Sequence, residues 1–409
     1  MKRYIALMLS VIFAIVPLSA CARRTDGEGD VKKITLTVWA PQEDQPDSDG
    51  WLPRMCESFN DAHPEWDITF KYGVCSEGDA GKNVSADPEG SADVFFYAND
   101  QLGSLLQAGA VSRLGGNVLK TIEETNSENM IASVTAADGG VYGVPFSGNT
   151  WFMFYNKSIF SEDDVKSLDR MLEKGKVAFP LTNSWYMGAF YLANGCTLFG
   201  DDGMDGAAGV EFGSKAGVEA TEYLCRLVKN KNFINDSEGA GLSGLLDGSV
   251  GAIFTGSWDA QKIEKALGDD FGVAPLPTAM IGNSPKQLLS FAGSKAVGVN
   301  PHCDAPEVAV ALAAHLGSYE AQKYHYEMRG IIPTNSRLLS EDRLEDDDVA
   351  QVQNETIDKT AVVQPTIPEM SVYWVPVENF GKAIVSGEVT EENAKEKTEA
   401  FNESLVASL

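Results

Sequence analysis

The sequence predicts an α/β protein, because short apolar strands alternate with helical segments along the whole chain. The stretch Val94-Phe95-Phe96 is apolar without alternation, as a parallel strand covered on both faces should be. Tyr97 and three polar residues, Asn99 to Gln101, follow before a helical run begins at Leu102. Ligands of open α/β sheets bind beyond the carboxyl ends of the strands, so this strand tip is a candidate binding position.

The same patterns place the other elements in order. Strands are expected at 33–39, 66–72, 141–145, 151–155, 176–180, 250–254, 272–275 and 296–300. Helices are expected at 52–62, 163–174, 188–193, 215–229, 240–247, 258–267, 305–317, 319–328, 371–386 and 391–408. The Gly-, Asp- and Ser-rich stretch 76–91 is expected to be a loop.

Composition and charge narrow the function classes. The chain has 409 residues, of which 44% are hydrophobic, and it carries a formal net charge of −27. Such a charge argues against a nucleic-acid partner and against an anionic substrate attracted over long range. A neutral or cationic ligand is compatible with it. The alternative is that the charge serves solubility alone.

The N-terminus resembles a lipoprotein leader. Lys2 and Arg3 precede an apolar run, 5–16, that is too short for a convincing membrane span. Leu18-Ser19-Ala20-Cys21 resembles a bacterial lipobox, in which Cys21 carries the lipid after cleavage. We therefore expect a lipoprotein signal peptide over 1–20, a flexible tether over 21–32, and an extracytoplasmic protein anchored to the cell membrane. An ordinary secretory signal is the alternative.

The sequence contains no convincing motif for a metal ion or a cofactor, so neither is expected. Gly239 to Gly244 matches GxGxxG but follows polar residues rather than a strand. The stretch 47–50 resembles half a calcium loop without its closing glutamate. Cys56 and Cys75 could form a disulfide, but the cysteines after Cys21 are odd in number and buried free thiols are the favoured interpretation.

Aromatic residues recur beside short polar residues at the ends of predicted elements. The positions are Trp39, Tyr97, Trp185-Tyr186, Trp258 and Tyr373-Trp374. The C–H face of a sugar ring packs on an aromatic face, and its hydroxyl groups need acceptors and donors such as Asp, Asn and Gln. The alternative is that these aromatic residues belong to the core. Because several such sites occur together, the pattern favours a carbohydrate-binding cleft.

Several collinear segments resemble the maltose/maltodextrin-binding branch of the extracellular solute-binding proteins of ABC importers. They are DVFFYANDQLGSLLQAGAV (93–111), YGVPFSGNTWFMFYNKSIF (142–160), GAIFTGSWDAQKI (251–263), FGVAPLPT (271–278) and QPTIPEMSVYWVPVENFGKAI (364–384). The resemblance implies a two-lobed periplasmic-binding-protein-like fold with a ligand cleft between the lobes. The implied N-terminal lobe is 33–148 plus 292–336, and the C-terminal lobe is 149–291 plus 337–409.

The resemblance also implies ligand-binding residues, position by position. Tyr97, Trp185, Tyr186, Trp258 and Trp374 fall on aromatic positions that pack against glucosyl rings, and Asp100 falls on a carboxylate that binds hydroxyl groups. Glu43 and Asp44 lie where the family has polar contacts, although the loop sequence differs. Gln101, Asn149, Asn183 and Glu378 occupy binding positions at which the maltose binder has other residues, so the hydrogen-bonding partners differ.

The expected function is that of a membrane-tethered, monomeric receptor rather than an enzyme. It would capture a neutral oligosaccharide, most directly a malto-oligosaccharide, and deliver it to the membrane subunits of an ABC permease. A secreted glycoside hydrolase is an alternative, because Asp100, Glu43, Asp44 and Glu378 could supply the two carboxylates that such an enzyme needs. A binder of another oligosaccharide, a peptide or a metal ion is the third possibility.

Overall fold

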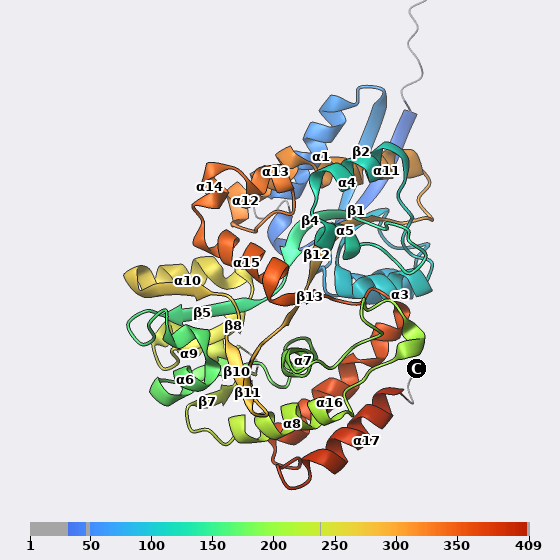
Figure 1. The fold of residues 1–409 in the computed structure, drawn as a ribbon. Coiled ribbons are helices and arrows are strands. Elements are labelled where there is room, and N and C mark those ends of the chain that lie inside the picture. The colour runs from blue at the N-terminus through green and yellow to red at the C-terminus, as the bar shows by residue number, and fades with distance from the viewer. Residues whose placement is uncertain (1–31, 46–49, 238, 407–409) are drawn as a thin grey trace, which may run out of the picture.

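The computed structural model describes residues 32–45, 50–237 and 239–406. The expected signal peptide, Cys21, almost all of the expected tether and residues 47–49 of the calcium-like loop lie outside these ranges. In the described part of the chain, no helix is both long enough and apolar enough to cross a membrane. The described residues form two α/β lobes, each built around its own sheet, which confirms the predicted fold class (Figure 1).

The sheet of the N-terminal lobe has the strand order β13-β12-β3-β1-β2, and β4 pairs with β12. Strands β1, β2 and β3 are parallel, whereas β12 is antiparallel to β3 and β4. The carboxyl ends of the three parallel strands therefore meet at one edge. The strand bounds are β1 Lys32–Ala40, β2 Trp66–Val74, β3 Val94–Ala98, β4 Val144–Asn149, β12 Ser290–Val299 and β13 Ala361–Val363.

The sheet of the C-terminal lobe has the order β7-β6-β8-β5-β9. Strands β6, β7 and β8 are parallel, and β5 is antiparallel to β8 and β9. The bounds are β5 Phe152–Asn156, β6 Val177–Phe179, β7 Phe233–Asn235, β8 Ala252–Thr255 and β9 Phe271–Ala274. A hairpin of β10 Thr278–Ile281 and β11 Ser284–Gln287 follows.

Helices cover both sheets, with their apolar faces turned toward the cores. The helices that begin before β4 are α1 Trp51–Ala62, α2 Ala80–Ala86, α3 Leu102–Gln107, α4 Gly116–Thr125 and α5 Glu128–Ala132. Those between β5 and β9 are α6 Leu168–Lys174, α7 Ser184–Ala193, α8 Lys215–Leu227, α9 Ala240–Asp247 and α10 Ala260–Leu267. After β12 come α11 Pro306–Leu316, α12 Tyr319–Arg329, α13 Ser336–Leu339, α14 Asp342–Glu345, α15 Asp348–Lys359, α16 Trp374–Val385 and α17 Ala394–Val406.

Each lobe has a hydrophobic core assembled from separate parts of the chain. One core draws its side chains from 34–146 and 296–321, and the other from 151–291 and 367–405. The chain therefore passes between the cores at 147–150 and again within β12. Leu338 and Leu344 pack with Tyr326 beside α12, although the expected boundary at 336 assigns them to the C-terminal lobe.

Some local predictions were wrong in instructive ways. The stretch 76–91, expected as a loop, contains α2, whose Ala80 and Val84 are buried. Helix α7 begins at Ser184 instead of Gly188, because the aromatic residues Trp185 and Tyr186 are already helical. The favoured interpretation of the cysteines was confirmed, because all of those from Cys56 to Cys303 are free and buried, and the alternative Cys56–Cys75 disulfide does not form. Burial raises the pKa of the Cys56 thiol to about 12.

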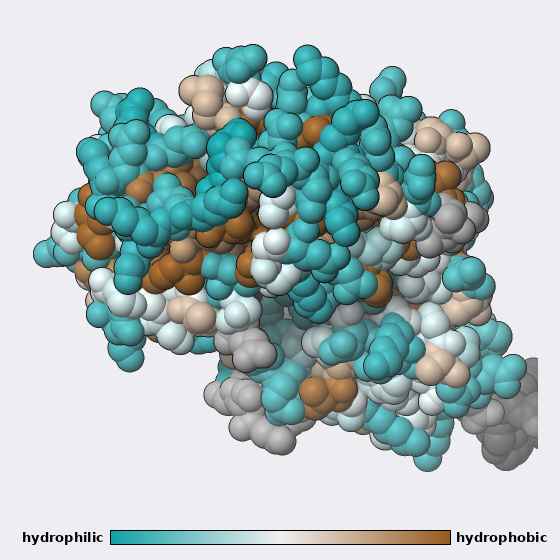
Figure 2. Space-filling view, turned by 90° about the horizontal axis from the view of Figure 1, so that it is seen from below, coloured by the Kyte–Doolittle hydropathy of each residue, from teal (hydrophilic) through white to brown (hydrophobic). Residues whose placement is uncertain are grey.

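The surface agrees with the strongly polar composition. Figure 2 shows that hydrophilic residues dominate the face seen from below, with hydrophobic residues gathered in smaller areas among them. Large apolar side chains with substantial exposure are few among the described residues, and one of them is Trp258. An indole left exposed in this way calls for a functional explanation more than the scattered aliphatic residues do.

Candidate functional site

The candidate site in the C-terminal lobe lies at the carboxyl ends of the parallel strands β6, β7 and β8. Asn183 and Trp185 follow β6, Asp236 follows β7, and Trp258 follows β8 in a short 3-10 turn, Ser257–Asp259. The sheet topology therefore brings together residues that are more than 70 positions apart in the sequence, as the numbering shows. This is the edge at which open α/β sheets bind ligands.

Trp185 and Trp258 form an aromatic surface at this edge. Their ring centroids lie 6.2 Å apart with an angle of 29° between the ring planes. The side chain of Trp258 folds back over Gly256, where an added Cβ would lie 2.1 Å from the indole. A glycine at position 256 is thus required for the ring to lie where it does. Trp258 is 37% exposed, so part of its ring is available to a ligand.

Trp185 is held by contacts at both its backbone and its ring. The side chain of Asn183 caps α7 by accepting a hydrogen bond from the Trp185 backbone N–H at 2.9 Å. The indole N–H of Trp185 donates to Oε1 of Gln364 at 2.9 Å. Asn183, predicted as a ligand contact, therefore positions Trp185 in this structure.

Tyr186 and Trp374 are less exposed than Trp258. Tyr186 is almost buried and its ring lies 4.7 Å from that of Trp151, and burial raises the pKa of its hydroxyl above the usual value. Trp374 begins α16, half-buried against Tyr373 and Phe291, with ring centroids 5.1 and 6.4 Å away. We call the surface formed by Trp185 and Trp258 the C-terminal wall. Tyr186 and Trp374 support this wall more than they extend its exposed surface.

A pocket of about 560 Å³ opens beside this wall and unites three predicted residues, Asn183, Tyr186 and Glu378. Thr255, Asp259 and Asp236 contribute polar groups to its lining. Glu378 forms an ion pair with Lys382 one turn later on α16. The pocket thus combines an aromatic ring with several hydrogen-bonding groups.

Asp100 supplies a carboxylate from the N-terminal lobe, immediately after β3. Its Oδ2 accepts a hydrogen bond from the Gln101 side chain at 2.7 Å. Burial raises the pKa of Asp100 to about 6, although the Gln101 hydrogen bond and the positive charge of Lys295 oppose the rise. The carboxyl group therefore changes charge close to neutral pH, which is unusual for an aspartate.

Asn149 lies at the end of β4, where the chain leaves the N-terminal lobe. Its side-chain amide donates to Oδ1 of Asn99 at 3.3 Å. Within the described ranges, Nδ2 of Asn99 and Nε2 of Gln364 are buried and have no hydrogen-bond partner. Buried polar groups are normally satisfied, so such amides are suited to bonding a ligand hydroxyl or a water molecule.

Two predicted ligand contacts are buried and make their contacts within the N-terminal lobe. Tyr97 is 0% exposed, and its hydroxyl donates to the backbone oxygen of Tyr142 at 3.3 Å inside the N-terminal core. Because alternate residues of a strand face opposite ways, Tyr97 shares the side of Phe95. The interpretation of Tyr97 as a stacking surface is therefore not supported.

Asp44 is the second of these residues. It is 4% exposed, and its Oδ1 lies 3.0 Å from Nε2 of His325 and 2.7 Å from Nη1 of Arg329. Burial works to raise the pKa of Asp44, but His325 and Arg329 together bring it below the usual value. Asp44 thus joins α12 to the rest of its lobe, whereas its neighbour Glu43 is exposed.

Sequence reasoning missed Lys295, Glu77 and Gln364, which the structure places near the predicted residues. Lys295 lies 3.3 Å from Glu77 and 5.8 Å from the ring centroid of Trp258. A signal was present, because Lys295 is the one charged residue in the apolar strand SFAGSKAVGV. In the described part of the chain, no group of three His, Cys, Asp or Glu side chains could hold a metal ion.

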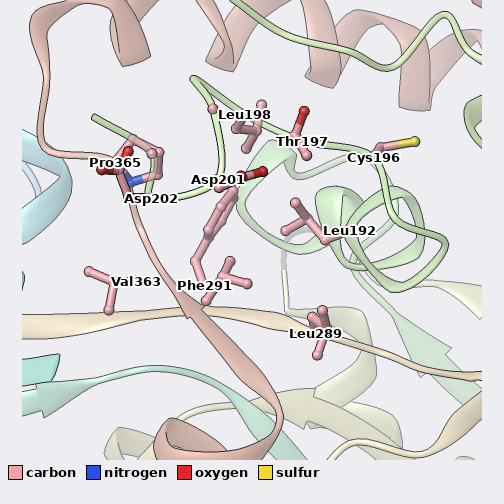
Figure 3. Close-up of a pocket in the computed structure, with 13 residues that line it drawn as sticks. Leu192, Cys196, Thr197, Leu198, Asp201, Asp202, Leu289, Phe291, Val363 and Pro365 are labelled. Atoms are coloured by element: carbon pink, nitrogen blue, oxygen red, sulfur yellow. The ribbon is translucent and has the colours of Figure 1, made fainter. Parts of the chain in front are cut away.

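A separate pocket of about 370 Å³ lies at the other end of α7, near Leu192. Figure 3 shows Leu289 and Phe291 on one side of it and the loop with Cys196, Leu198 and Asp201 on the other. The predicted ligand residues do not line this pocket. It is therefore distinct from the wall formed by Trp185 and Trp258.

The arrangement of these groups suits the binding of a polar molecule. The C-terminal lobe contributes a partly exposed indole surface, and the N-terminal lobe contributes the Asp100 carboxyl and the amides of Asn99 and Asn149. Such a site accepts a polar molecule that also has an apolar face. Fold and site together define a two-lobed solute-binding protein.

Comparison with known proteins narrows this class to a family. Residues 54–351 match the family model described as bacterial extracellular solute-binding protein, and this chain belongs to that family. A maltooligosaccharide ABC transporter solute-binding lipoprotein of Streptococcus pneumoniae is 26% identical, covering 94% of this chain and 92% of the relative. A galactooligosaccharide-binding protein of Bacillus subtilis is 24% identical, covering 92% and 91%. One protein solved with acarbose is 48% identical, with a TM-score of 0.87, covering 92% of this chain and 99% of that one.

Proposed function

We propose that this protein captures malto-oligosaccharides outside the cytoplasm and delivers them to an ABC importer. The observation that carries the proposal is the Trp185–Trp258 aromatic surface at the strand ends of one lobe. Lys295 links it to the other lobe, because its Nζ lies 5.8 Å from the Trp258 ring centroid and its charge acts on the carboxyl of Asp100. Glucosyl rings linked in a chain present repeated apolar faces and hydroxyl edges. They match an extended aromatic surface better than a single small polar molecule does.

The relatives support the same ligand class. The pneumococcal relative is named for maltooligosaccharides, and the protein that is 48% identical was solved with acarbose. The Bacillus relative is named for galactooligosaccharides, so a galactosyl oligosaccharide is the alternative ligand to test. The binding residues we assign to this chain are Trp185 and Trp258 with Asp100. Secondary candidates are Trp374, Tyr186, Asn149, Gln101, Glu43 and Glu378.

The importer context includes an anchor and a partner. We infer that Cys21 carries a lipid that holds the protein at the membrane, and that the partners are the membrane subunits of an ABC permease. The lipobox supports the anchor, and the name of the pneumococcal relative, a solute-binding lipoprotein, agrees with it. We further propose that the protein works as a monomer, because each two-lobed chain contains a complete candidate cleft.

The proposal is tested by incubating the purified protein with maltohexaose in equilibrium dialysis. A receptor retains the sugar on its side of the membrane and releases it intact on denaturation. A glycoside hydrolase would return shorter sugars, which chromatography detects, and would need two carboxylates across the scissile bond. If the protein retained galactosyl oligosaccharides but not maltohexaose, the proposed ligand would be wrong, whereas the assignment as an oligosaccharide-binding receptor would stand.

A further inference from the structure

Lys295 lies on β12, a strand that contributes side chains to the cores of both lobes. Strand β12 contributes Phe291 to the C-terminal core and Ala296 to Val299 to the N-terminal core. Lys295 pairs with Ala98, the last residue of β3, on one side and with Ser147 of β4 on the other. Its backbone is therefore fixed by two neighbouring strands at the point where the lobes meet.

The side chain of Lys295 points to the same region as the candidate ligand residues. Its Nζ lies 3.3 Å from Oε1 of Glu77, and the two side chains are 22% and 16% exposed. The same Nζ lies 5.8 Å from the ring centroid of Trp258 in the other lobe, within the range of a cation–π contact. The charge of Lys295 also acts on the carboxyl of Asp100. An ammonium thus lies between a carboxylate-bearing edge and an exposed indole.

This combination matches the edge of a sugar ring. A sugar hydroxyl both donates and accepts hydrogen bonds, whereas an ammonium only donates and an ionised carboxylate only accepts. Two adjacent hydroxyl groups can therefore accept from Lys295 and donate to Asp100 at once. A ring that packs on Trp258 would turn its hydroxyl edge toward both groups. Hydrogen bonds to charged groups are stronger than those between neutral groups.

We propose that Lys295 is a ligand-binding and specificity-determining residue, which donates to hydroxyl groups of the sugar ring packed on Trp258. Glu77 holds the ammonium in place, and Asp100 accepts from the adjacent hydroxyl. This inference rests on the proposed function and names a contact at the same cleft. The opposite arrangement, in which Lys295 covers Trp258 and competes with the sugar, predicts the reverse effect on affinity.

The test is calorimetric titration of wild type and Lys295→Met with maltotriose. Methionine keeps the unbranched apolar stem of the side chain but removes the ammonium with its donors and charge. We expect affinity to fall about tenfold or more. Lys262→Met is the matched control. Lys262 is an exposed lysine on α10, and its Nζ lies 3.8 Å from Oδ1 of Asp259, the residue that follows Trp258. The control should bind like wild type.

Two further measurements separate contact from structure. The double variant Lys295→Met/Glu77→Gln also removes the Glu77 carboxylate that loses its ion-pair partner in the single variant, so it should fold while remaining a weak binder. A mono-deoxy maltotrioside that lacks the contacted hydroxyl should bind the wild type more weakly than maltotriose binds it. The Lys295→Met variant should bind the deoxy sugar and maltotriose equally well, because the contact is already lost.

The outcomes distinguish the inference from the proposed function. Unchanged or tighter binding by Lys295→Met, with wild type binding maltotriose, overturns the inference alone. Equal losses in Lys295→Met and Lys262→Met also overturn it, because the effect would then be one of overall charge. A wild-type protein that binds none of these sugars overturns the proposed function and the inference with it.

Discussion

At the scale of single residues, the site depends on a few side chains that are kept partly open to solvent. Trp258 is the clearest case, because its indole is exposed and is held over a glycine that admits no Cβ. Asp100 is the second, because it is half-buried and desolvation raises the pKa of its carboxyl to about 6. The effects of changing these two residues can be separated by pH.

Replacing Trp258 with alanine should weaken malto-oligosaccharide binding about ten- to hundredfold, which corresponds to about 1.4–2.8 kcal/mol. The loss follows from removing an aromatic surface that packs on a glucosyl ring. Calorimetry measures it. Trp66→Ala is the control, since Trp66 is a half-buried indole at the amino end of β2, the end of the strand away from the cleft. Similar affinities for Trp258→Ala and wild type would remove Trp258 from the site.

Asp100→Asn should abolish a pH dependence of binding. The folded-state pKa of Asp100 is raised to about 6, so in the wild type the carboxyl gains its charge as the pH rises through 6. The ionised form is the stronger acceptor for a hydroxyl, so wild-type affinity should rise between about pH 5 and 7. Asp100→Asn should show no such rise, whereas the exposed-residue control Asp67→Asn should keep it. A wild-type affinity that is flat over this range would contradict the contact.

The same raised pKa has a consequence for stability with a definite sign. Because the folded state holds the proton of Asp100 more tightly than the unfolded chain does, this residue's contribution to the free energy of unfolding falls as pH rises from about 4 to about 6. Asp100 therefore costs stability at neutral pH. Such a cost is common at functional sites.

At the scale of elements, helix α7 connects local sequence to site geometry. Asn183 caps the helix, and the cap fixes where α7 begins after β6 and so where Trp185 lies in its first turn. The sequence SWYMGAFYLA does not reveal this start, because aromatic and apolar residues occur all around the helix and its periodicity is weak.

Asn183→Ala should lower the free energy of unfolding by about 1 kcal/mol, because the cap hydrogen bond is lost. Asn183→Asp should retain most of the stability, since the aspartate oxygen caps equally well. Denaturant unfolding measures both variants. Equal destabilisation by alanine and by aspartate would mean that the cap does not hold this helix. Loss of sugar affinity in Asn183→Asp at wild-type stability would assign the amide a direct ligand contact as well.

Elements and residues differed in how far the sequence predicted them. Strands such as β1 and β3 are apolar enough to be recognised locally, and the aromatic residues of the C-terminal wall stood out beside glycine and serine.

Tyr97 was misplaced because the direction of a side chain depends on which face of β3 is covered, and position 97 shares the core face with Phe95. Asp44 was misplaced because its partners His325 and Arg329 are about 280 residues away in the sequence. Lys295 was missed because nothing local to β12 reveals its proximity to Trp258.

At the scale of the whole molecule, the two lobes are joined by chain segments that include 147–150 and β12. Sugar contacts from both lobes would be made together only when the lobes approach each other, so ligand should favour a closed form. Small-angle scattering should show a smaller radius of gyration at saturating maltohexaose than without sugar. Trp258→Ala at the same sugar concentration is the control for non-specific effects. A radius that does not change would favour a static binding module.

The central claim is that the cleft between the lobes binds glucosyl oligosaccharides through its aromatic wall. Calorimetric titration of the purified protein with maltotriose, maltohexaose and a galactosyl trisaccharide of equal length tests it most directly. We expect one site per chain for both glucosyl sugars and weaker or undetectable binding of the galactosyl one. Loss of the site in the double variant Trp185→Ala/Trp258→Ala, with wild-type thermal stability, would complete the predicted result. Tighter binding of the galactosyl sugar, or unaltered binding by the double variant, would contradict the account.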